Sequence, residues 1–170
     1  MKALVVYFSH VGQNWVGGGV VNLVKGNTEV VAEYIRDITG ADIFKIETEN
    51  PYPKNYDECT HVAKEELKSD ARPSLKALPG NDLDQYDTIF IGGPVWWGTY
   101  PMAIFTFMER YQWEGKKIMP FTTHEGSALG DCVRDVKRVA RGADVMPGLA
   151  IYGSNAADAR PEIERWIKEN

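Results

Sequence analysis

The chain has 170 residues, of which 44% are hydrophobic and 25% are charged, and these proportions are typical of a globular protein. This length favours one domain, so we treat residues 1–170 as a single unit. The formal net charge of −5 at pH 7 argues against a nucleic-acid partner.

The sequence shows no clear signal for a membrane span, a signal peptide or a disulfide scaffold. No apolar run approaches the roughly 20 residues of a membrane-spanning helix, which argues against a membrane partner. The two cysteines are too few for a disulfide scaffold, and the apolar run near the start is too short for a signal peptide. The sequence therefore predicts a cytoplasmic protein.

Hydrophobic runs alternate with amphipathic stretches along the chain. Strands are predicted at residues 3–8, 42–47, 88–91, 117–121 and 144–152. Helices with one apolar stripe are predicted at residues 28–39 and 56–69, and in the stretches that follow Pro101, Ser127 and Pro161. The segment Gly92-Gly93-Pro94 is expected to end the third strand, and Ser127 to cap the fourth helix after a polar loop that begins at Thr122.

Five successive strand–helix units require parallel strands joined by right-handed crossovers. Eight units would close a barrel, whereas five form an open α/β sheet with helices on both faces. In such sheets, ligands bind beyond the carboxyl ends of the strands. We therefore expect the function to lie in the loops after the first, third and fourth strands.

The segment after the first strand is rich in groups that bind an anion. Ser9 ends the strand, and Asn27 and Thr28 open the next helix, whose first N–H groups lack partners. Hydroxyls and free N–H groups at a helix N-terminus favour a phosphate without any lysine or arginine. The alternative is that Ser9 only ends the strand and Thr28 only caps the helix. The fingerprints of nucleoside triphosphate and dinucleotide sites are missing, which disfavours those ligands.

The next two loops offer an aromatic surface and a polar edge. Trp96 and Trp97 are adjacent in a loop bounded by glycines, so both cannot face the core. An indole exposed there favours stacking on a planar ring, with packing over helix ends as the alternative. The loop from Thr122 to Ser127 offers hydroxyls and N–H groups. A single loop histidine, His124, is more typical of a hydrogen-bonding residue than of a metal ligand, so we predict no metal site.

A phosphate site, an aromatic surface and a polar loop at one edge suit a mononucleotide with a flat ring. In these motifs and in element order, nearly all of the chain resembles the flavodoxin family, in its short-chain form. The motifs that carry the resemblance are Tyr7-Phe8-Ser9, Gly26-Asn27-Thr28, Gly93 to Gly98 and Thr123 to Ser127. The resemblance implies a three-layer sandwich whose five-stranded parallel sheet has the order 2-1-3-4-5, and it implies FMN as the cofactor.

The resemblance also assigns residues to the parts of FMN. It places the phosphate at Ser9, Val11, Asn27 and Thr28. It places the isoalloxazine ring against Pro94, Val95, Trp96, Trp97 and Gly98. It places the outer edge of the ring near Thr123, His124, Glu125 and Gly126.

One departure from the family concerns the phosphate loop. Residues 12–25 interrupt a loop that is continuous in flavodoxins, and Val11 stands where the family has a second hydroxyl. We expect His10 or Asn14 to supply the missing donor. The insertion includes Trp15 and is apolar enough to form a flap over the flavin or to contact a second copy in a homodimer. A flexible surface excursion is the alternative.

Three functions remain open at this point. The first is an FMN-binding electron-transfer protein that serves a redox partner protein or a small-molecule electron acceptor. The second is an FMN-dependent enzyme that oxidises NAD(P)H and reduces quinones or similar acceptors, with the flavin face open beside His124 and Tyr100. The third is a binding module without flavin. We favour the first, although the residues do not separate it from the second, and we assign no catalytic residue.

Two further groups of side chains have plainer interpretations. Cys59 and His61 lie on a charged helix and are interpreted as surface residues. A basic patch on the fourth helix is interpreted as a solvated face, with docking of an acidic redox partner as the alternative. The patch consists of Arg134, Lys137, Arg138 and Arg141.

Overall fold

The computed structural model describes residues 2–80 and 83–170. Its main sheet contains β1 (Ala3–Tyr7), β4 (Asp42–Lys45), β5 (Thr88–Pro94), β6 (Lys117–His124), β7 (Asp144–Val145) and β8 (Leu149–Tyr152). The strands follow the order β4-β1-β5-β6, and β7 and β8 both pair with β6. The pairings are parallel, so the predicted order 2-1-3-4-5 is confirmed, with β7 and β8 sharing the fifth position.

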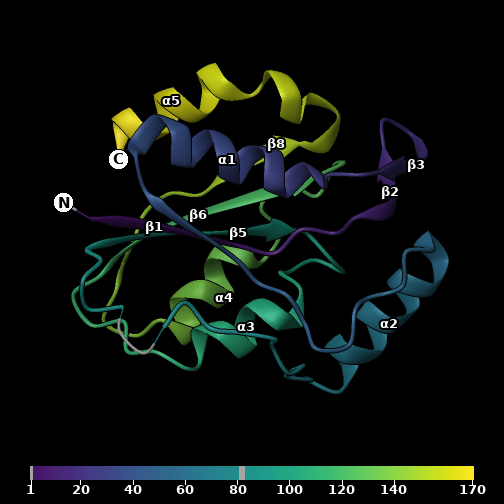
Figure 1. Ribbon diagram of the computed structural model, residues 1–170, viewed down its shortest axis with the longest axis horizontal. Coiled ribbons are helices and arrows are strands. Elements are labelled where there is room, and N and C mark those ends of the chain that lie inside the picture. Colours follow the sequence, from purple (N-terminus) through teal and green to yellow (C-terminus); the bar gives the residue numbers. More distant parts are fainter. Residues whose placement is uncertain (1, 81–82) are drawn as a thin grey trace.

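Helices cover both faces of the sheet (Figure 1). α1 (Asn27–Thr39) and α5 (Arg160–Glu169) lie on one face, and α3 (Met102–Met108) and α4 (Cys132–Val139) lie on the other. α2 (Tyr56–Lys68) lies to one side, beyond the ends of the strands. Each face of the sheet buries an apolar cluster of its own, as a three-layer sandwich requires. Among the helices of the described residues, none has the length and apolarity needed to cross a bilayer.

β5 and β6 are both longer than the sequence predicts. Gly92, Gly93 and Pro94 do not end the third strand; they continue β5 and pair with residues 121–123 of β6. The expectation of a polar loop from Thr122 is likewise wrong, because β6 runs to His124. Gly92 makes this pairing possible, since a Cβ atom at that position would lie 2.0 Å from the ring of Phe121.

The fourth helix begins at Cys132, later than predicted. Ala128 and Gly130 have φ angles of 53° and 47°, which are left-handed and exclude both residues from a right-handed helix. Ser127 therefore does not cap α4, and its carbonyl group instead accepts a hydrogen bond from the N–H of Gly130 at 2.9 Å. The predicted cap is wrong because a tight turn precedes the helix.

The last predicted strand is interrupted between β7 and β8. Pro147 lies in the interruption and has no N–H group with which to continue the ladder. Gly148 follows it, and a Cβ atom there would lie 2.8 Å from the side chains of Leu129 and Val133. The break therefore lets the chain pass close to the start of α4.

The insertion after β1 forms an antiparallel hairpin of β2 (Gly12–Val16) and β3 (Gly19–Leu23). Gly17 and Gly18 make the turn, with φ angles of 61° and 91°. A two-residue turn with both residues left-handed matches the twist of paired strands, and glycine adopts it without steric cost.

The hairpin is attached to the residues at the start of α2. The N–H of Gln13 donates to the carbonyl of Lys54, and the side-chain oxygen of Gln13 accepts from the N–H of Tyr56, both at 2.8 Å. The Trp15 ring lies 6.1 Å from that of Tyr56, measured between centroids. The insertion and α2 therefore form one structural unit beside the sheet (Figure 1).

Tyr100 joins β5 and β6 to the residues that precede α3. Its ring is fully buried, and its hydroxyl donates to the carbonyl of Phe121 at 2.7 Å and lies 3.1 Å from that of Ile91. Burial raises the pKa of this phenol well above its ordinary value. The expectation that places Tyr100 beside an open flavin face is therefore wrong.

Replacing Tyr100 with Phe keeps the ring but removes a buried hydrogen-bond donor. We expect the free energy of unfolding to fall by about 1–3 kcal/mol, because buried carbonyl groups lose their partner. Tyr152→Phe is the matched control, since Tyr152 is 50% exposed and should change stability by less than about 0.5 kcal/mol. Urea unfolding measures the difference, and equal midpoints for both variants and the wild type would contradict the expectation.

Candidate functional site

A cavity of about 500 Å³ lies beyond the carboxyl ends of β1, β5 and β6, and its size is typical of small-molecule sites. Most of the predicted site residues line it, namely Ser9, His10, Asn14, Asn27, Thr28, Pro94, Val95, Trp96, Trp97, Gly98, Thr123, His124 and Glu125. Val11 and Gly126 are not among the described lining residues. The structure adds residues that the sequence does not single out for this site, namely Gln13, Tyr56, Cys59, Thr60, Ala63 and Gly153. Trp15 of the insertion and Ser127 of the predicted polar loop also line the cavity.

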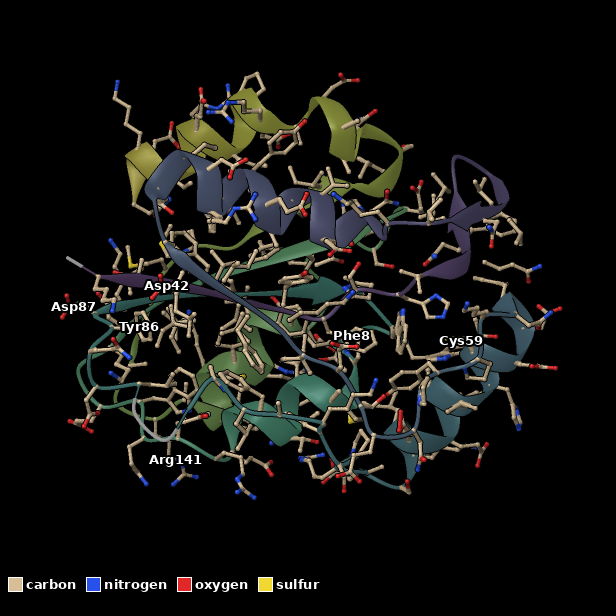
Figure 2. The ribbon with its side chains drawn as sticks, viewed as in Figure 1. Phe8, Asp42, Cys59, Tyr86, Asp87 and Arg141 are labelled. Atoms are coloured by element: carbon tan, nitrogen blue, oxygen red, sulfur yellow. The ribbon has the colours of Figure 1, made fainter. Side chains whose placement is uncertain are left out.

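The two ends of the sheet carry different groups (Figure 2). Cys59, on α2, lines the cavity, and Phe8, directly after β1, is buried in the apolar cluster on one face of the sheet. Asp42, Tyr86 and Asp87 lie at the opposite end, where the Tyr86 hydroxyl donates to the Asp42 carboxylate at 2.7 Å. The cavity therefore lies at the carboxyl edge at which ligands bind in open parallel sheets.

The start of α1 forms one end of the cavity. An α-helix has no internal acceptors for its first N–H groups, and the Ser9 hydroxyl accepts from one of them, that of Glu29, at 3.2 Å. Gly26 permits this contact, because a Cβ atom there would lie 2.1 Å from Ser9 Oγ. The buried Thr28 hydroxyl lies 2.7 Å from that of Thr123 and joins α1 to β6. Three hydroxyls therefore gather at a helix N-terminus.

His10 and Asn14 hold the chain between β1 and the hairpin. The Asn14 amide donates to the carbonyl groups of His10 at 3.0 Å and Gly12 at 3.2 Å. In the His10 ring, Nε2 lies 2.8 Å from the carbonyl of Pro53, and Nδ1 lies 3.4 Å from the Asn14 side-chain oxygen. The Asn14 amide and the His10 ring therefore contact backbone carbonyl groups of this loop and of the segment before α2, and the expectation that either side chain supplies the missing phosphate donor stays a prediction.

The two adjacent tryptophans take different positions. Trp96 packs against the core, with its ring centroid 5.3 Å from that of Phe8 and 5.0 Å from that of Tyr52. Trp97 is 50% exposed, and its indole N–H donates to the carbonyl of Thr60 on α2 at 2.9 Å. Trp97 has a φ angle of 52°, which is uncommon for a residue with a large side chain. This backbone conformation turns its ring away from the core and toward α2.

The start of α4 fixes the loop that carries both tryptophans. The Thr99 hydroxyl donates to the buried carboxylate of Asp135 at 2.6 Å, and the N–H of Asp131 donates to the carbonyl of Gly98 at 2.7 Å. Arg134 and Arg138, from the basic patch, lie 3.4 Å and 3.7 Å from the same Asp135 carboxylate. The loop therefore has little freedom to move.

His124 lies at the end of β6, next to Tyr152 at the end of β8. The two ring centroids are 4.3 Å apart. Its Nδ1 accepts a hydrogen bond from the N–H of Gly126 at 2.9 Å, so this nitrogen carries no proton. Burial lowers the pKa of His124, and the Glu125 carboxylate offsets this only in part. The ring is therefore neutral at pH 7, with its proton on Nε2.

α2 forms the wall of the cavity opposite the sheet. Cys59 lines this wall and is only 5% exposed, so its assignment to the surface is wrong, whereas His61 is exposed as predicted. Burial, with a contribution from the Glu66 carboxylate, raises the pKa of the Cys59 thiol to about 12. A thiol that stays protonated at pH 7 is a weak nucleophile, so Cys59 contributes shape to the cavity.

The lowered pKa of His124 predicts how stability depends on pH. A histidine with a lower pKa in the folded state binds fewer protons there than when unfolded, so the fold loses stability as pH falls below the ordinary value of 6.5. We expect His124→Gln to weaken this loss between pH 7.5 and pH 5.5. Urea unfolding of both proteins at the two pH values measures the effect, and an unchanged pH dependence in the variant would count against it.

Solved structures of flavoproteins are similar to this chain in fold. Among solved structures, the chain is similar to a candidate flavoprotein from Bacteroides uniformis, with 26% identity, a TM-score of 0.77, and coverage of 98% of this chain and 97% of that one. A flavoprotein from Lactobacillus acidophilus in complex with FMN is 23% identical, with a TM-score of 0.65 and coverage of 92% and 97%. A Fusobacterium nucleatum flavodoxin bound to flavin mononucleotide is 13% identical, with a TM-score of 0.56 and coverage of 99% and 96%.

Sequence comparison gives a family. No curated protein sequence matches the chain. The family model described as Flavodoxin matches residues 20–170, from the second strand of the hairpin to the last residue of the chain. This match includes α1 and the loops after β5 and β6. The chain belongs to the flavodoxin family.

Proposed function

We propose that this protein binds FMN and acts in electron transfer as a redox flavoprotein. One observation carries the proposal: the open N-terminus of α1 and the half-exposed Trp97 lie on the same cavity. A phosphate monoester joined to a flat ring needs both surfaces together. The structures from Lactobacillus acidophilus and Fusobacterium nucleatum, both described with FMN, support this choice of ligand.

The residues at the α1 end fit a phosphate. The N–H groups of Asn27 and Thr28 are in the first turn, where the helix dipole favours negative charge. The Ser9 oxygen accepts from the N–H of Glu29 and keeps its own hydrogen to donate. The absence of a Cβ atom at Gly26 keeps Ser9 close to the helix. These uncharged donors would hold the phosphate without a cation among the described lining residues.

The residues at the other end fit a planar ring. Trp97 is anchored to α2 at its indole N–H, so one face of its ring has a fixed place on the cavity wall. His124 ends β6 on the same rim and offers a polar ring for the edge of a heterocycle, whereas the Thr123 hydroxyl lies 2.7 Å from that of Thr28, toward the α1 end. The Trp96 ring packs against Phe8 and Tyr52, so Trp96 is a weaker candidate than Trp97 for stacking on the ligand.

When bound, FMN supplies the electron chemistry, and the chain sets its affinity, exposure and potential. The protein has a net charge of −5, and Glu125 lies on the cavity itself. Negative charge near the ring disfavours the addition of further negative charge. We therefore expect the chain to lower the reduction potential of the bound cofactor relative to free FMN.

A second candidate function draws on the hairpin and α2. They add a wall with Trp15 and Tyr56, and this wall could hold a second flat molecule over the ring. The corresponding activity is that of an NAD(P)H-dependent FMN reductase of quinones or similar acceptors. In either case we propose a cytoplasmic protein that passes electrons to a redox partner protein or a small acceptor, with a homodimer as a possible assembly.

FMN titration of the apoprotein tests the proposed function. We expect bound FMN to absorb near 450 nm, and Thr28→Val to weaken binding by about 1.5–3 kcal/mol, because a charge-assisted hydrogen bond to the phosphate is lost. Thr106→Val is the matched control, since Thr106 lies on α3 outside the cavity lining. A wild-type protein that binds no FMN would contradict the proposed function. Equal FMN affinities for the wild type and both variants would show that Thr28 does not bind the phosphate.

Photoreduction without oxygen separates the two candidate functions. A carrier should accept electrons one at a time and should oxidise NAD(P)H slowly. A reductase should pass directly to the two-electron state and consume NAD(P)H once a quinone is added. Trp97→Ala should shift the potential in both cases, and an unchanged potential and spectrum would rule out stacking on this residue.

A further inference from the structure

We infer that Glu125 is a positioning residue whose carboxylate fastens the β2–β3 hairpin across the cavity and thereby slows the exchange of the bound cofactor. The inference deepens the proposed function and rests on it, although one part of its test needs no FMN. The family match begins at residue 20, so it includes Glu125 and Ser154 but not Gly17, the partner of Glu125 in the hairpin.

Glu125 connects three segments that are distant in the sequence. It directly follows β6, and its Oε2 atom accepts a hydrogen bond from the N–H of Gly17 in the hairpin turn at 3.2 Å. Its Oε1 atom accepts from the N–H of Ser154 at 2.9 Å, in η1 (Gly153–Asp158). One side chain therefore joins the tip of the hairpin to the edge of the sheet and to the segment after β8.

The chemistry of these contacts suits a carboxylate. Two backbone N–H groups need two acceptor oxygens, and an ionised glutamate offers both with a favourable charge. Gly17 presents its N–H outward from a left-handed turn with a φ angle of 61°. Gly153 lets the third segment approach, because a Cβ atom there would lie 2.9 Å from Glu125 Oε1 and 2.5 Å from Asn27 Nδ2.

The first strand of the hairpin and its tip contact different parts of the structure. Its first strand is held beside α2 through the backbone and side chain of Gln13. Its tip is held by Glu125, through a contact that is open to solvent. Since Trp15 lies between these two attachments and lines the cavity, release of the tip would move one wall of the site. Breaking a solvent-exposed hydrogen bond costs little free energy, so we expect the hairpin tip to open more often than the rest of this wall.

Rates of FMN binding distinguish a fastening residue from a residue that only shapes the site. A fastened hairpin obstructs both entry and exit, so Glu125→Ala should raise the association and dissociation rate constants at least fivefold each. The equilibrium affinity should change less than either rate constant. Glu125→Gln keeps one acceptor oxygen and should give intermediate rates. Glu162→Ala, on α5 and outside the cavity lining, is the matched control and should leave both rates unchanged.

Stopped-flow fluorescence gives these rate constants. A rise in the dissociation rate alone would overturn the inference, because it would show lost affinity without a freed entrance. Unchanged rates would overturn it as well. Thermal unfolding of each apoprotein shows whether the variants fold, and Glu125→Gln carries the test if Glu125→Ala does not.

Hydrogen exchange in the apoprotein provides the part of the test that is independent of FMN. Glu125→Ala should speed exchange of the Gly17 and Ser154 amides about tenfold and leave those of Gln13 and Tyr56 unchanged. Equal exchange at Gly17 in wild type and variant would overturn the inference. A wild-type protein that binds no FMN would instead overturn the proposed function, and FMN binding with unaltered rates would overturn the role of Glu125 alone.

Discussion

The parallel, in-register pairing of β5 with β1 and β6 is the constraint on which the rest of the structure depends. Tyr7, the last residue of β1, pairs with Gly92, and Gly92 pairs with Phe121, so β5 and β6 run past the end of β1 to Pro94 and His124 at the same edge of the sheet. Gly92 has to lack a side chain because the Phe121 ring fills that space. The pairing brings the start of α1, the tryptophan loop and the end of β6 to one edge, and the cavity follows from it.

The two walls of the cavity differ in how they are held: one is the hydrogen-bonded edge of the sheet, and the other is formed by the hairpin and α2. The sheet edge is rigid, because its strands are paired on both sides and the tryptophan loop is held by the buried Asp135. The hairpin and α2 lie outside the sheet and connect to it through a few contacts, such as that of the Trp97 indole with Thr60. Local opening is easier where few buried contacts hold a segment. This division suits a ligand held firmly along one side and admitted from the other.

Much of the fold follows from the sequence, because strands that are apolar on both faces and helices with one apolar stripe have distinct periods. The strand order and the cluster of three loops could be predicted for this reason. The ends of β5 and β6 could not, since Gly92 and Pro94 favour a turn until the Phe121 ring is placed against them. The left-handed φ of Ala128, which delays α4, leaves no mark in the sequence. The burial of Cys59 does not follow from the sequence, because periodicity shows which side of α2 is apolar, but not that the hairpin and Trp97 contact this helix.

The positions of the two cysteines have a practical consequence. Cys59 is part of α2, the cavity wall that lies outside the sheet. Cys132 is fully buried in the apolar cluster between the sheet and the helices α3 and α4. Both thiols need exposure before an alkylating reagent can reach them, but the first needs only displacement of α2 and the second needs the core to open. The rate at which Cys59 is alkylated should therefore report local opening of the cavity wall, and the rate at which Cys132 is alkylated should report unfolding of the whole domain.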